Sequence, residues 1–209
     1  MGLLINLLNP NQMKKSVKTL TLLTIASFYL NQVPAQFKLP SINGVAADVR
    51  KVIEDYPSRF IHLMGEVVSQ NTQSTDYKCN FPVKGAEESI VTRYSAKKEI
   101  CSWQALMLTT EDFDKAKQKF KSLFNQLNNL AVEIGSNNKF HLKGRYEMPV
   151  EEMKFTSILF TLEPGTETTG KLKVELSMQY QAPMEWKVKV LVYDREREDD
   201  ERGKTVESR

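Results

Sequence analysis

The sequence predicts an α+β fold in two layers, built from two units that each contain one helix followed by an antiparallel meander of four strands. Two segments have apolar residues at helical spacing, and each is followed by strand-like runs with turn residues between them. Hydrophobic residues make up 41% of the 209 residues, a globular proportion that excludes a wholly disordered chain. Because no apolar stretch reaches the roughly 20 residues that a bilayer requires, a protein with several membrane spans is also excluded.

The first unit is expected to cover residues 36–109. Val45, Val49 and Val52 recur at helical spacing and predict a helix over 44–56, which Pro57 ends. Apolar or alternating runs then predict four strands, at 60–68, 77–81, 89–95 and 99–108.

The second unit is expected to cover residues 110–194. Thr110 is a candidate helix cap, and Phe120 and Leu123 belong to an apolar stripe that continues to about residue 129 or 132. Separators that contain proline or glycine divide the remainder into four strand-like runs, at 139–148, 153–162, 171–180 and 185–194.

This order of elements resembles tandem cystatin-like halves, in which one helix precedes an antiparallel meander in each half. The resemblance concerns topology alone, without a shared motif, so it carries no function. It implies two units joined edge to edge, with both helices on one face of the sheet.

Residues 1–35 have the pattern of a secretory signal peptide. They contain no acidic residue, and three lysines within 13–18 precede the apolar run 20–30. Small residues at 33–35 favour cleavage near the Ala35–Gln36 bond, after which the mature chain would be periplasmic or extracellular in a bacterium. An uncleaved anchor or a buried core helix is the alternative interpretation of the apolar run. Met13 offers a second possible start, immediately before the lysines.

Export would leave the mature chain without net charge. Cleavage would remove the three lysines of the signal peptide, and their three positive charges account for the whole formal net charge of +3. A neutral surface argues against nucleic acid as a partner, because phosphate binding requires clustered basic residues.

The charged tail 195–209 has too few apolar residues to form a core and is expected to be disordered, with a solvated helix extension as the alternative.

Cys79 and Cys101 are the only two cysteines. In an oxidising compartment they are expected to form a disulfide, with two buried thiols or a redox pair as alternatives. Nothing in the sequence has the spacing of a zinc or calcium site or of a phosphate-binding loop, so we expect neither a metal nor a cofactor.

The sequence offers little for catalysis. His62 and His141 are the only histidines, and neither lies in a recognisable nucleophile motif. Strand alternation predicts that His141 is exposed, whereas the apolar neighbours of His62 favour a hydrogen-bonded, partly buried ring. Neighbouring acids such as Glu87 and Glu88 are expected to be solvated. We therefore assign no catalytic residue.

Strand alternation also predicts a basic patch on the outer sheet face of the second unit. Its members are Lys143, Arg145, Lys173, Lys187 and Lys189. The alternative is an ordinary solvated face whose charges discourage edge pairing. The resulting hypothesis is an exported, non-catalytic binding protein that contacts an acidic protein or a glycan through a sheet face or hairpin loops. The alternatives are an exported hydrolase with an unrecognised site and an assembly or structural component of the cell envelope.

Overall fold

The structure is a computed structural model that describes residues 44–95, 100–135 and 138–194, except for the side chains of residues 167 and 168. All of these residues belong to one compact unit within 42–209. The predicted signal peptide, the predicted start of the mature chain and the predicted disordered tail lie outside the described residues.

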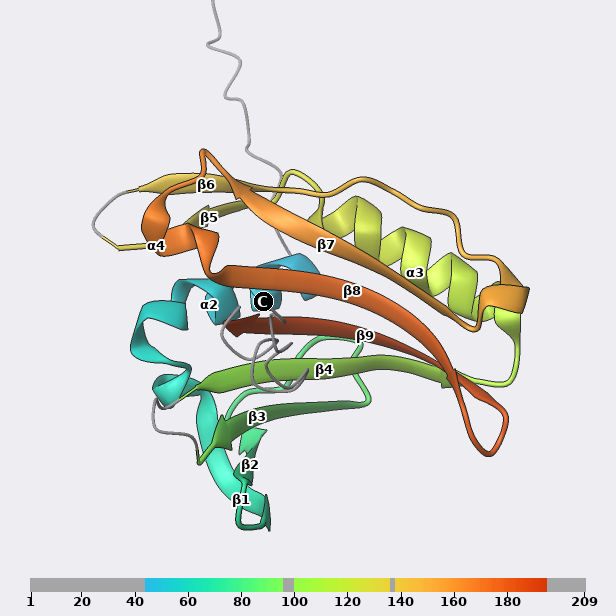
Figure 1. Cartoon of the computed structure of the whole chain (residues 1–209), viewed down its shortest axis with the longest axis horizontal. Coiled ribbons are helices and arrows are strands. Elements are labelled where there is room, and N and C mark those ends of the chain that lie inside the picture. Colours follow the sequence, from blue (N-terminus) through green and yellow to red (C-terminus); the bar gives the residue numbers. More distant parts are fainter. Residues whose placement is uncertain (1–43, 96–99, 136–137, 195–209) are drawn as a thin grey trace, which may run out of the picture. The chain divides into compact units, whose positions relative to one another are not determined.

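A single antiparallel sheet of nine strands dominates the described residues, in the order β1-β2-β3-β4-β9-β8-β7-β6-β5 (Figure 1). The strands are β1 Met64–Gln70, β2 Ser74–Cys79, β3 Glu88–Tyr94, β4 Cys101–Thr110, β5 Ala131–Glu133, β6 Lys139–Lys143, β7 Phe155–Glu163, β8 Leu172–Gln181 and β9 Glu185–Asp194. The helices are α2 Val45–Glu54, α3 Phe113–Leu127 and the short α4 Glu167–Gly170, and the 3₁₀ turns are η1 Tyr56–Ser58, η2 Ile61–Leu63 and η3 Glu151–Met153.

The prediction of two helix-plus-four-strand units, and with it the tandem cystatin-like arrangement, is wrong. Strands β4 and β9 pair from Ser102↔Tyr193 to Thr110↔Trp186, in the middle of one continuous sheet. Helix α3 packs on β4 as well as on β8 and β9, and α2 packs against α3 and β5. Five strands follow α3, one more than predicted, and the additional strand is β5. Residues from the whole described chain therefore share one hydrophobic core, and no boundary at residue 109 separates two units.

Helix α3 shows why local periodicity identified this element correctly. Its buried residues, Ala116, Phe120, Leu123, Phe124 and Leu127, recur every three or four positions. The cap is Asp112 rather than the predicted Thr110, because the Asp112 carboxylate accepts a hydrogen bond of 3.0 Å from the Lys115 backbone N–H. That hydrogen bond lowers the pKa of Asp112.

Strand alternation determines which side chains enter the core. Trp103 of β4 and Trp186 of β9 are both buried. Phe113 of α3 lies 5.1 Å from Trp186 between ring centroids, and Phe124 stacks on Phe160 of β7 at 5.8 Å. These contacts place α3 on the face of the sheet that carries both tryptophans, which we call the inner face. The opposite face is the outer face.

The predicted disulfide does not form. Cys79 and Cys101 are both buried, and no disulfide joins them. Cys101 lies opposite Arg93, and Arg93 lies opposite Thr75, which is four residues from Cys79 along β2. Strand and residue spacings then separate the two Cα atoms by about 16 Å, whereas a disulfide requires less than about 7 Å. The prediction failed because it was based on the expected oxidising compartment. The strand register, which sets the distance between the two cysteines, did not enter it.

No helix in residues 44–95, 100–135 and 138–194 combines the length and the apolar character needed to cross a membrane.

Candidate functional site

The outer face exposes alternate residues of the central strands. Val91, Trp103 and Val192 lie opposite one another on β3, β4 and β9 and point into the core. Their neighbours Ile90, Gln104 and Leu191 therefore form a row on the outer face. These three side chains are only partly buried, so they remain accessible to a partner.

The structure brings together only two of the five residues predicted to form the basic patch. Lys187 and Lys189 are two positions apart on β9, so both point to the outer face. Lys173 lies opposite Tyr193 at the far end of the same strand pair, beyond Glu175.

Lys143 and Arg145 do not join Lys187 and Lys189. Lys143 lies on β6, three strands from β9, and its ammonium group donates a hydrogen bond to the Asn129 side chain. Arg145 is exposed in the connection that follows β6 and belongs to no strand. The candidate site is therefore centred on Lys187 and Lys189 alone.

A small hollow of about 140 Å³ lies beside the two lysines. Its lining comes from three adjacent strands and consists of Glu88, Ile90, Gln104, Leu106, Lys187 and Lys189. Leu106 stands between Glu88 and Lys189 in one row across the sheet. The hollow thus has an apolar floor with an acidic group on one side and basic groups on the other.

The Lys189 ammonium group has a lowered pKa in this hollow. Partial burial lowers its pKa, the nearby Lys187 ammonium lowers it further, and only Glu88 acts in the opposite direction. Lys187 has a partner, because its Nζ atom lies 3.9 Å from Glu185 Oε2. Within the part of the chain that the structure describes, no carboxylate lies within ion-pair distance of Lys189. Among the described residues, Lys189 is therefore attracted by Glu88 without forming a direct ion pair.

Sequence reasoning missed four residues of this hollow: Glu88, Ile90, Gln104 and Leu106. Alternation along β3 and β4 assigns them to the outer face once the strand limits are known. Their position beside Lys189 depends on the pairing of β4 with β9, which joins residues far apart in the chain. No local signal in one sequence reveals that pairing.

The two histidines lie outside this hollow. His62 Nδ1 is 2.6 Å from Asp55 Oδ1, which confirms the predicted hydrogen bond. The His62 side chain is 71% exposed, so the expectation of partial burial was wrong. His141 is exposed on β6, as predicted. An aspartate can orient a histidine for proton transfer, but this pair does not line the hollow beside Lys187 and Lys189.

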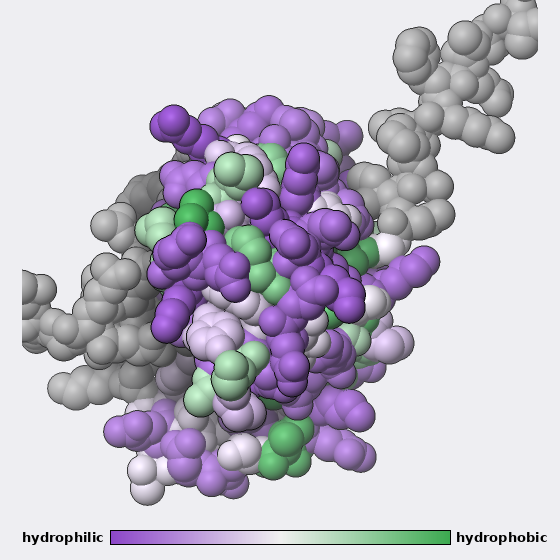
Figure 2. Space-filling view, turned by 90° about the vertical axis from the view of Figure 1, so that its right-hand side faces the viewer, coloured by the Kyte–Doolittle hydropathy of each residue, from purple (hydrophilic) through white to green (hydrophobic). Residues whose placement is uncertain are grey.

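The end of the sheet that carries the β8–β9 hairpin offers no large apolar surface. Figure 2 shows this side, where hydrophobic residues form small groups separated by hydrophilic ones. Exposed hydrophobic residues scattered in this way are ordinary on a protein surface.

Among the described residues, no group of three or more histidine, cysteine, aspartate or glutamate side chains is arranged to hold a metal ion.

No family model, curated protein or solved structure is significantly similar to this chain.

Proposed function

We propose that this protein is a binding protein whose outer sheet face holds an acidic segment of a protein partner at Lys187 and Lys189. The observation that carries the proposal is the Lys189 ammonium group, which borders the hollow and forms no direct ion pair among the described residues, although Glu88 borders the same hollow. A partner carboxylate there would replace lost hydration with a charge-assisted hydrogen bond. The second basic group at Lys187 would add attraction during encounter.

The apolar neighbours of the two lysines favour a protein partner over a glycan. Leu106 and Leu191 lie beside Lys189 on the outer face and are partly exposed. On β7, Phe155 and Leu159 of the same face are 48% and 43% exposed. A mixed surface of apolar and basic groups suits a segment that alternates acidic and apolar side chains.

Replacing Lys189 by glutamine should weaken the binding of a fluorescein-labelled peptide of alternating glutamate and leucine. We expect a loss of roughly tenfold, since a charge-assisted hydrogen bond contributes about 1.5–3 kcal/mol. Fluorescence anisotropy at low ionic strength measures the dissociation constant, and added salt should weaken binding to the wild-type protein.

The matched control is Lys121→Gln, which removes the same charge from an exposed position of α3. This variant should bind the peptide as the wild type does. Equal affinity of the Lys189→Gln variant and the wild type would contradict the proposal. So would equally tight binding of a peptide of alternating lysine and leucine.

The proposed place of action is outside the cytoplasm, and the support comes from the sequence of residues 1–35. Expression of the full chain in a bacterium should yield an exported protein whose mass corresponds to a start at Gln36. Intact mass spectrometry of the periplasmic and culture fractions measures this directly. Recovery of the chain from the cytosol with residues 13–35 still attached would contradict export.

A further inference from the structure

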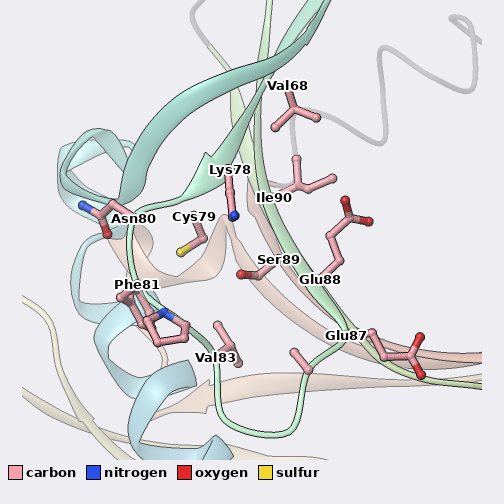
Figure 3. A pocket seen from close by; sticks show the side chains of 12 residues that line it. Val68, Lys78, Cys79, Asn80, Phe81, Val83, Glu87, Glu88, Ser89 and Ile90 are labelled. Carbon is pink, nitrogen blue, oxygen red and sulfur yellow. The ribbon is translucent and has the colours of Figure 1, made fainter.

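A second, larger hollow lies where strands β2 and β3 separate. The two strands pair from Ser74↔Tyr94 to Lys78↔Ile90 and then diverge into the connection 80–87. The hollow between the diverging strands and this connection has a volume of about 720 Å³ (Figure 3). Small-molecule sites in proteins commonly have volumes of about 300–1,000 Å³.

Half of the residues that line this hollow are apolar, namely Val68, Phe81, Pro82, Val83, Ala86 and Ile90. Val68 and Ile90 lie at one end of the space, and Phe81 and Val83 lie at the other (Figure 3). Val68 is 55% exposed, whereas Val83 is buried. Such residues can cover an alkyl chain and remove it from water.

The polar groups that enter the hollow are few and come from neighbouring positions. Figure 3 shows the side chains of Lys78, Cys79 and Ser89 directed into the space. Lys78 forms no ion pair or hydrogen bond among the described residues. Its ammonium group is therefore available to a ligand.

The side chains of Asn80 and Glu87 are already hydrogen-bonded and point away from the space (Figure 3). Asn80 donates a hydrogen bond from its side-chain amide to the His62 carbonyl oxygen. Both carboxylate oxygens of Glu87 accept hydrogen bonds from Thr109, at 2.8 Å from its backbone N–H and at 2.7 Å from its hydroxyl group. The carboxylate of Glu88 also borders the outer-face hollow, where it acts on Lys189.

We propose that this hollow binds an aliphatic carboxylate. The alkyl chain would lie against the apolar residues of the lining, and the carboxylate would accept a charge-assisted hydrogen bond from the Lys78 ammonium group. An uncharged chain of the same length would bury the same apolar area and leave Lys78 without a countercharge. The charge of Lys78 thus selects an anionic head group over a neutral one.

Isothermal titration of the full-length protein with decanoate tests the site, and decanol serves as the uncharged probe. Decanoate should bind about tenfold more tightly than decanol, because only the carboxylate can accept charge-assisted hydrogen bonds from Lys78. In the Lys78→Gln variant this preference should disappear, with the affinity for decanol unchanged. Val68→Glu, a change at an exposed position, should weaken decanoate binding by charge repulsion.

Two control variants separate this site from other lysines. Lys84→Gln removes a charge from the same connection at an exposed residue outside the lining, and it should leave decanoate binding unchanged. Lys189→Gln should also leave it unchanged, so the outer-face proposal and this one can fail independently. The absence of decanoate binding, or equal affinities for decanoate and decanol in the wild type, would overturn the proposal. An unaltered affinity of the Lys78→Gln variant for decanoate would overturn it as well.

Discussion

Replacing Phe120 by alanine is expected to lower the free energy of unfolding by about 3–5 kcal/mol, which is the range measured for large aromatic deletions in protein cores. Phe120 lies in the middle of α3 with 0% of its surface exposed. Its ring lies 6.4 Å from the ring of Tyr146 between centroids, and α3 covers β4, β8 and β9. The substitution would remove this packing and leave a cavity between the helix and the sheet. Urea denaturation followed by circular dichroism measures the change.

The neighbouring residue Lys121 provides the control, because it belongs to the same helix and is exposed. Lys121→Ala should change stability by no more than about 0.5 kcal/mol, as most surface substitutions do. A similarly small loss for Phe120→Ala would mean that α3 does not pack on the sheet as the structure shows.

Replacing Gly144 by alanine is expected to cost about 1–3 kcal/mol, the usual penalty for overpacking a core. A Cβ atom at this position would lie 2.7 Å from Cδ1 and 2.8 Å from Cε1 of Phe160. Phe160 is only 1% exposed, and its ring stacks on Phe124 of α3, so it has little room to move. Thermal unfolding should therefore occur at a lower temperature in the variant.

Gly170→Ala is the matched control for this experiment. An added Cβ atom at Gly170 would meet no heavy atom within 4 Å. Alanine also has a higher helix propensity than glycine, so this variant should be as stable as the wild type or slightly more so. Equal losses for the two variants would contradict the close packing of Gly144 against Phe160.

The two proposed sites differ in the ligand that each would hold. The hollow at Lys189 is small and lies on a sheet surface, so it suits one side chain of a larger partner. The hollow beside Lys78 is larger, and half of its lining residues are apolar, which suits a small amphipathic molecule. Glu88 borders both hollows, which places the two sites next to each other along β3.

Several local predictions were confirmed because each depends on a few neighbouring residues. The stripe that includes Phe120 and Leu123 identified α3, since one face of a helix must be buried. Alternation placed Lys187 and Lys189 on the face opposite the core. The short strand β5 was missed, because three residues are too few for a pattern to show.

The sequence by itself determined which faces of α3 and β9 are buried, since burial of apolar side chains imposes a period that is visible along the chain. Only the tertiary structure decided that β4 lies beside β9, which merges the two predicted units into one sheet and brings Glu88, Leu106 and Lys189 into one row. It also decided that Cys79 and Cys101 lie too far apart for a disulfide. The physical reason is that strand neighbours are selected by contacts between distant residues, and such contacts leave no period in a single sequence.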